Sequence, residues 1–184
     1  GCDLYISFDN TEVGRLMAES MLENIPDGGD IFLIQGPLTD NNVSLIREGI
    51  DETLAGSNLN VVYEANCPGW IAENAYTYTK EGLKLDRNVK GIICGNDDLA
   101  SQAFRALSEE RLAGKVCVTG QDGDLAACQR IVEETQEMTA FKSVEQEASL
   151  AAKCAVLLGL GEEIEEVQDT AYDGTYNVPY LELQ

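Results

Sequence analysis

Histidine is absent from this chain of 184 residues, and basic residues are scarce. There are 12 lysines and arginines against 33 aspartates and glutamates, which gives a formal net charge of -21. Such a chain repels phosphate backbones and anionic membrane surfaces, so nucleic acid is not an expected partner. Without histidine, the usual general base for a serine or cysteine nucleophile is missing, and so are most zinc and haem ligand sets.

Long apolar runs and phosphate-binding motifs are also lacking. The apolar run at 154–160 is far too short to span a bilayer. There is no G-x-x-x-x-G-K-S/T loop and no G-x-G-x-x-G after an expected strand. Asp122-Gly123-Asp124 is only a fragment of a calcium loop, because the remaining ligand positions are absent. We therefore expect no cofactor, no metal ion and no enzymatic activity.

The six cysteines form no C-x-x-C pair. Cys94 and Cys117 lie in apolar runs that read as buried strands, where cysteine behaves as a small hydrophobe. We expect most of the cysteines to be free thiols. The alternative is that Cys2 or Cys67 pairs with another chain.

Apolar runs of strand length alternate with segments of helical periodicity. A short strand is expected at 4–6, and further strands at about 31–35, 60–65, 90–94, 115–119 and 137–141. The helices between and after them are expected to begin near 10, 43, 71, 97, 124 and 144, and a β-like stretch near 164–171 and an extended segment near 178–183 end the chain. This alternation predicts an α/β fold, a three-layer αβα sandwich around a mostly parallel sheet.

One predicted helix departs from the amphipathic pattern. Residues 150–160 are apolar on nearly every side, whereas a surface helix keeps a polar face. We expect this helix to pack against something larger than the predicted sheet.

Polar or aromatic side chains follow successive strands of the predicted sheet. They are Asn42, Trp70, Asn96, Asp122 and Lys142. Because the carboxyl ends of parallel strands share one edge, these five side chains are expected to converge there. Amides, a carboxylate and an ammonium group exchange hydrogen bonds with hydroxyls, and an indole offers a flat apolar surface. The set suits a neutral polyhydroxylated ligand.

Each of these residues also has an ordinary structural alternative. Asn42, Asn96 and Asp122 are well placed to cap the helices that follow them. Trp70 could pack into the core at a helix start, and Lys142 could be a solvated lysine. Their joint placement at successive strand ends is what favours a binding site.

A family resemblance runs over nearly the whole chain. The segments that carry it are Tyr5-Ile6-Ser7-Phe8-Asp9-Asn10, Val13-Gly14, Asp40-Asn41-Asn42, Gly69-Trp70, Glu73-Asn74-Ala75, Asn96-Asp97, Gly120-Gln121-Asp122-Gly123-Asp124-Leu125, Thr135-Gln136, Met138-Thr139 and Phe141-Lys142. In this order and spacing the chain resembles the second lobe of periplasmic D-xylose-binding proteins, more than the ribose or galactose binders.

The resemblance implies roles for the five residues and a division of the chain. Trp70 would stack on the sugar ring, Asp122 and Lys142 would accept and donate as charged groups, and Asn42 and Asn96 would supply amide hydrogen bonds. Residues 1–141 would form the second lobe, 142–170 would cross into the first lobe, and 171–184 would be a returning extended tail. The first lobe itself is missing, so helix 144–158 needs a substitute partner such as a second copy of the chain.

The resemblance also implies a function. We expect a non-enzymatic receptor for a monosaccharide, D-xylose or a related aldose, that feeds an ABC-type importer through a membrane permease. Its expected location is extracytoplasmic, in the periplasm or as a cell-surface lipoprotein. The chain reads as trimmed from a longer protein, with a mature lipoprotein beginning at Cys2 as the alternative. Without the first lobe we expect weak sugar binding or none.

Three other functions stay open. The first is a sensor that reports sugar occupancy to a membrane histidine kinase. The second is the effector core of a lactose-repressor-type regulator, and the third is an enzyme on a flavodoxin-like sheet.

Overall fold

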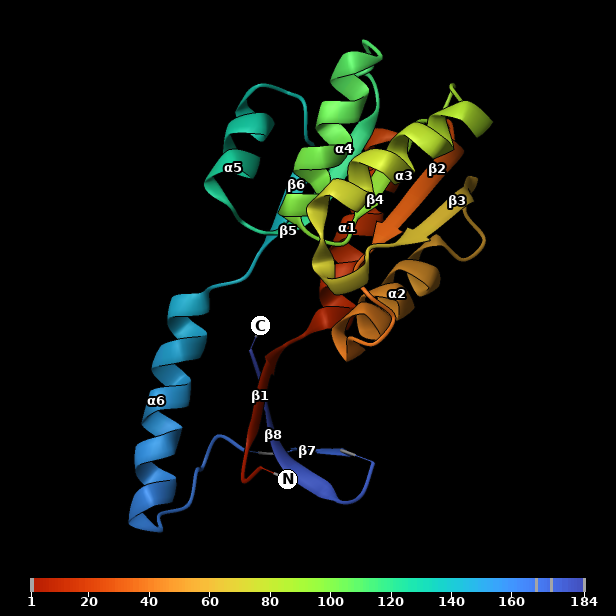
Figure 1. Ribbon diagram of the computed structural model, residues 1–184. Coiled ribbons are helices and arrows are strands. Elements are labelled where there is room, and N and C mark those ends of the chain that lie inside the picture. Colours follow the sequence, from red (N-terminus) through yellow and green to blue (C-terminus); the bar gives the residue numbers. More distant parts are fainter. Residues whose placement is uncertain (1, 168, 173, 184) are drawn as a thin grey trace. The chain divides into compact units, whose positions relative to one another are not determined.

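The computed structural model describes residues 2–167, 169–172 and 174–183. The chain forms two compact units (Figure 1). The larger is Asn10–Phe141, and the smaller combines Gly1–Asp9 with Lys142–Gln184. The predicted second lobe of 1–141 ends at the same residue as the larger unit. It begins elsewhere because the first strand of the chain pairs with the last one.

A five-stranded sheet forms the centre of the larger unit, and every pairing in it is parallel. Its strand order is β3-β2-β4-β5-β6. The strands are β2 (Gly29–Gln35), β3 (Leu59–Asn66), β4 (Gly91–Cys94), β5 (Cys117–Asp122) and β6 (Met138–Phe141). The predicted α/β fold with a mostly parallel sheet is confirmed.

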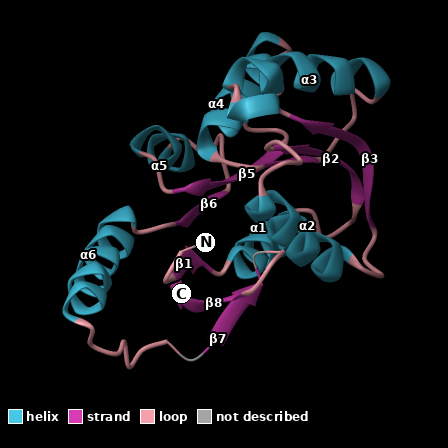
Figure 2. Ribbon diagram, turned by 60° about the horizontal axis from the view of Figure 1, so that its bottom comes forward, coloured by secondary structure: helices cyan, strands magenta, loops and turns pink. Residues whose placement is uncertain are grey.

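Helices cover both faces of this sheet. Figure 2 shows α1 and α2 on one face and α3 and α4 on the other. The helical segments of the unit are α1 (Asn10–Asn24), α2 (Asn41–Leu54), the short 3-10 helix η1 (Pro68–Trp70), α3 (Ala72–Leu85), α4 (Asp97–Glu109) and α5 (Leu125–Val132).

The strands separate two apolar clusters because successive side chains point to opposite faces of a sheet. In β2, Phe32 and Ile34 pack with α3 and α4, whereas Ile31 and Leu33 pack with α1 and α2. All four are fully buried or nearly so. Burying a side chain of this size contributes about 1.5–3 kcal/mol, so this one strand contributes to the stability of both layers.

Two glycines allow α1 and α2 to pack at close range. A Cβ atom on Gly14 would collide with the carbonyl oxygen of Ile46, and one on Gly49 would collide with that of Thr11. Each helix therefore lies directly on the backbone of the other. No side chain fits between them at these two points.

The smaller unit contains a three-stranded sheet and one helix. The elements are β1 (Tyr5–Phe8), α6 (Val144–Leu160), β7 (Asp169–Tyr172) and β8 (Asn177–Leu183). β8 pairs parallel with β1 and antiparallel with β7. Ser143 caps the start of α6, and Gly161 ends it in a left-handed conformation.

The expectation of a strand from 164 is wrong by several residues. The strand begins only at Asp169, because the preceding acidic segment turns back toward α6. The amide of Val167 donates to the carbonyl of Ile164, and Lys153 on α6 forms an ion pair with Glu166. These two local contacts take the place of the strand pairing that the apolar residues Ile164 and Val167 suggest.

All six cysteines lie in the described part of the chain, and none forms a disulfide with another of them. Cys67, Cys94, Cys117 and Cys154 are buried, and Cys2 and Cys128 are exposed. Within the described residues, no helix is long and apolar enough to cross a membrane.

The close approach of α1 and α2 predicts that Gly14→Ala destabilises the larger unit. The added methyl group would force the helices apart, and overpacking of this kind costs about 1–3 kcal/mol. For a chain of this size we expect the melting temperature to fall by roughly 2–12 °C in calorimetry.

The matched control is Gly159→Ala in α6, where an added Cβ meets no atom within 4 Å. Alanine is the better helix former, so the melting temperature should stay the same or rise slightly. Equal effects of the two substitutions would contradict the proposed contact between α1 and α2.

Candidate functional site

Four of the five predicted ligand residues lie at the carboxyl edge of the large sheet. Asn42 is on α2 just after β2, Trp70 ends η1 after β3, Asn96 precedes α4 after β4, and Asp122 is the last residue of β5. Because all five strands are parallel, these positions follow one another along a single edge.

The loop after β2 leads into α2, and Asn42 lies in the first turn of that helix. Asp40 is the N-cap of α2, and its carboxylate accepts from the backbone N–H of Asn42 at 3.0 Å. The side-chain oxygen of Asn42 accepts from Nδ2 of Asn10 at 3.1 Å. Asn42 is therefore not the cap, and its NH₂ group is not used by either bond.

The indole of Trp70 lies on glycine backbone. A Cβ atom at Gly36 would collide with its six-membered ring, and one at Gly95 would come within 3.2 Å of it. The indole N–H donates to Oδ2 of Asp40 at 3.1 Å. Trp70 is half-buried and packs against the core cluster beneath α3 and α4. Trp70 therefore packs against the core, as its structural alternative predicts, and also keeps part of its ring exposed at the sheet edge.

Asn96 is the N-cap of α4. Its Oδ1 accepts from the backbone N–H of Leu99 at 2.9 Å, which is the structural alternative considered for this residue. Capping uses the side-chain oxygen only. The NH₂ group at the other end of this amide makes no hydrogen bond to any of the described residues.

Asp122 has an unusual backbone conformation. Its φ is +106°, a value that residues other than glycine rarely adopt. It does not cap the next helix, since the N-cap of α5 is Asp124, which makes no side-chain cap bond. Burial, together with the nearby charges of Asp97 and Asp98, raises the pKa of Asp124 above its ordinary value.

Lys142 belongs to the smaller unit, immediately after the last residue of β6. Its Nζ lies 5.6 Å from the centre of the Phe8 ring, within the range of a cation–π contact. Its convergence with the four residues of the larger unit stays a prediction.

Several buried polar groups at the same edge were not singled out from the sequence. Gln121 donates to the carbonyl of Gly95, which ties the end of β5 to the end of β4. Within the described residues, the other amide atom of Gln121 and both amide atoms of Gln35 have no hydrogen-bond partner. A glutamine that directly follows an apolar run of four residues, as Gln35 follows Ile31 to Ile34, is the sequence signal that would have drawn attention to this region.

The buried thiols near this edge are held in their neutral form. Burial raises the pKa of Cys67, which precedes η1, to about 11. Burial likewise raises the pKa of Cys94. At neutral pH both are thiols rather than nucleophilic thiolates, so they act as small apolar residues.

The position of the indole can be tested with Gly36→Ala. The new methyl group would push the ring away from the backbone, so the fluorescence emission of the single tryptophan should shift to longer wavelength as water reaches it. Thr39→Ala changes an exposed residue of the same loop and should leave the emission unchanged. An unshifted spectrum for Gly36→Ala would show that the ring does not lie against the backbone of Gly36.

Comparison with known proteins agrees with this architecture. A family model described as periplasmic binding protein domain matches residues 1–163. The D-xylose-binding periplasmic protein of Haemophilus influenzae is 40% identical over 182 residues, which cover 96% of this chain and 54% of that protein. The protein of the same description from Escherichia coli is 38% identical with the same coverage. The chain therefore spans about half the length of these curated relatives.

A solved structure shows the same fold. It is an ABC transporter solute binding protein from Clostridium phytofermentans with bound β-D-glucose, with a TM-score of 0.83 and 25% identity. The superposition covers 98% of this chain and 62% of that one. The resemblance seen in the sequence is confirmed, and the family match over residues 1–163 shows that this chain belongs to the periplasmic binding proteins.

Proposed function

We propose that this chain forms the second lobe of an extracytoplasmic receptor that binds a monosaccharide and delivers it to an ABC importer. D-xylose or a related aldose is the proposed ligand, because the relatives that are 38–40% identical are described as D-xylose-binding. Their description as periplasmic supports the location. The receptor would act by binding alone, without catalysing a reaction.

The observation that carries this proposal is strained backbone at the sheet edge. Among the described residues, those other than glycine with positive φ are Trp70, Arg111, Asp122 and Glu134. Trp70 and Asp122 are both predicted ligand residues. Such conformations cost on the order of 1–3 kcal/mol each and concentrate at ligand sites, where the surrounding structure maintains them.

The hydrogen bonds already made by the two asparagines define what they can offer a sugar. The side-chain oxygens of Asn42 and Asn96 accept bonds from the protein, so their NH₂ groups would donate to sugar hydroxyl oxygens. Asp122 would accept from sugar hydroxyls, and Lys142 would donate. The exposed part of the Trp70 ring would stack on the C–H face of the sugar.

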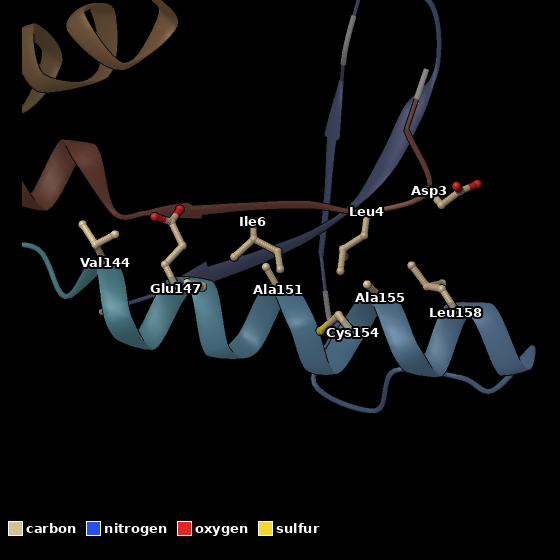
Figure 3. Close-up of a pocket in the computed structure, with 10 residues that line it drawn as sticks. Asp3, Leu4, Ile6, Val144, Glu147, Ala151, Cys154, Ala155 and Leu158 are labelled. Atoms are coloured by element: carbon tan, nitrogen blue, oxygen red, sulfur yellow. The ribbon is translucent and has the colours of Figure 1, made fainter.

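We further propose that the apolar surface of α6 is covered by the remaining part of a longer protein. Within the smaller unit, Leu4, just before β1, and Ile6 of β1 point toward α6 and line a groove of about 560 Å³ with Ala151, Cys154 and Leu158 (Figure 3).

Val144, which lines one end of this groove, is 69% exposed, and beyond the groove Val156 and Leu160 of α6 are 62% and 68% exposed. Apolar side chains in such number on one helix are typical of an interaction surface. The chain spans only 54% of its curated relatives, so the remaining part of such a protein is the natural occupant. A second copy of the chain would take its place when the chain is alone.

Sugar binding can be tested by thermal unfolding of the longer protein, in which this chain is joined to a first lobe. D-xylose at about 100 times its Kd stabilises by about 2.7 kcal/mol, so the melting temperature should rise by several degrees. Trp70→Ala and Asp122→Asn should weaken binding at least tenfold. Asp27→Asn, an exposed carboxylate in the turn before β2 and so at the opposite edge, is the control and should change nothing. No rise with any pentose or hexose would refute the proposal.

The covering of α6 can be tested by sedimentation of the chain alone and of the longer protein. We expect the chain alone to self-associate as its concentration rises and the longer protein to remain monomeric. Val156→Lys together with Leu160→Lys should abolish the self-association. Glu163→Lys adds a positive charge at an exposed polar position and should have little effect. Self-association of the longer protein to the same extent would show that α6 stays uncovered in it.

A further inference from the structure

Asp97 is a buried carboxylate that gathers hydrogen bonds from three separate segments. Only 1% of its surface is exposed. Its Oδ2 accepts from Oγ1 of Thr139 at 2.7 Å, from the amide of Asp124 at 3.0 Å and from the amide of Gly123 at 3.1 Å. Its Oδ1 accepts from Nε2 of Gln136 at 3.0 Å. One side chain therefore connects the start of α4 to the β5–α5 loop and to β6.

The geometry around this carboxylate leaves little freedom. A Cβ atom at Gly120 would collide with Oδ1 of Asp97, so β5 passes directly against it. Thr139 also accepts from the amide of Gly123 at 3.0 Å, so this amide is held by two oxygens.

Arg130 supports the same arrangement from its other side. It is 7% exposed, and its guanidinium donates to Oε1 of Gln136 at 2.9 Å, to Oγ of Ser101 at 2.6 Å and to the carbonyl of Asp97 at 3.3 Å. By holding the oxygen of the Gln136 amide, Arg130 directs the NH₂ group of that amide toward Asp97. Arg130 thus reaches Asp97 at its backbone carbonyl and, through the amide of Gln136, at its carboxylate.

The two amides that meet Oδ2 follow the strained residue directly. Asp122 has a φ of +106° and Gly123 a φ of +78°. Successive residues with unusual φ values turn neighbouring N–H groups into one concave anion site. Here the anion is the side chain of Asp97, and the backbone that it fixes is the one that carries Asp122.

We propose that Asp97 is a positioning residue for the sugar site. Its carboxylate holds the backbone of Asp122 and Gly123 in the strained conformation, and so presents the Asp122 side chain to the ligand. Asp97 itself does not touch the sugar. This inference rests on the proposed function, which assigns Asp122 to the ligand.

The test uses Asp97→Asn in the longer protein, with Asp98→Asn as the matched control. Asparagine keeps the shape but replaces one acceptor oxygen by a donor, so it cannot accept from all four groups. Asp98 is exposed, adjoins Asp97 in the first turn of α4, and loses the same charge. We expect Asp97→Asn to weaken xylose binding by tenfold or more at a temperature at which the protein is fully folded. Asp98→Asn should stay within twofold of the parent protein.

A double-mutant cycle separates positioning from a general loss of stability. If Asp97 acts through Asp122, then Asp97→Asn should change affinity little in a protein that already carries Asp122→Asn. Equal losses in both backgrounds, or equal affinities of Asp97→Asn and Asp98→Asn, would overturn the inference while leaving the proposed function intact. If Asp97→Asn fails to fold, Thr139→Val should weaken binding and Thr139→Ser should restore it.

Amide hydrogen exchange provides a measurement without ligand. The amides of Gly123 and Asp124 should exchange at least tenfold faster in Asp97→Asn than in Asp98→Asn. Unchanged exchange would refute the role of Asp97 even in a protein that binds sugar. If the parent protein binds no sugar while Asp97→Asn still accelerates exchange as expected, the proposed function and the ligand role of Asp122 are refuted, and with them the inference for the sugar site.

Discussion

Parallel pairing places the end of every strand of the larger unit at the same edge of the sheet. Each crossing helix carries the chain back to the opposite edge, so the polar loops after β2, β3, β4 and β5 have no other place to lie. Neighbouring loops are then tied together: Trp70 contacts Gly36, Gly95 and Asp40, and Gln121 reaches the carbonyl of Gly95. The site depends on this pairing more than on any single side chain.

The elements of the larger unit were predictable because their signals are local. Ile31 to Ile34 form an unbroken apolar run of strand length, and β2 extends only two residues before it and one after it. The strand near 164 was misplaced for the opposite reason: the contact of Lys153 with Glu166 joins residues that sequence periodicity does not connect. The division into two units also depends on a pairing between the two ends of the chain.

At the site, the sequence predicted positions better than roles. Four candidate residues reach the expected edge, because strand ends can be located from apolar runs. That Asn96 caps α4, and that Asp40 rather than Asn42 caps α2, depends on which of several adjacent oxygens faces a free amide. The glycines beneath the indole and the bonds of Asp97 depend on distances between segments that are far apart in the chain, and no spacing in the sequence reveals them.

The packing of the Trp70 ring against glycine backbone limits how a site of this kind can change its preference among ligands. The ring lies on main-chain atoms of Gly36 and Gly95 rather than on side chains, so no substitution beneath it can alter its tilt by small steps. In the divergence of related sequences, selectivity would have to arise from the polar residues of the adjoining loops, while the aromatic platform stays in one orientation.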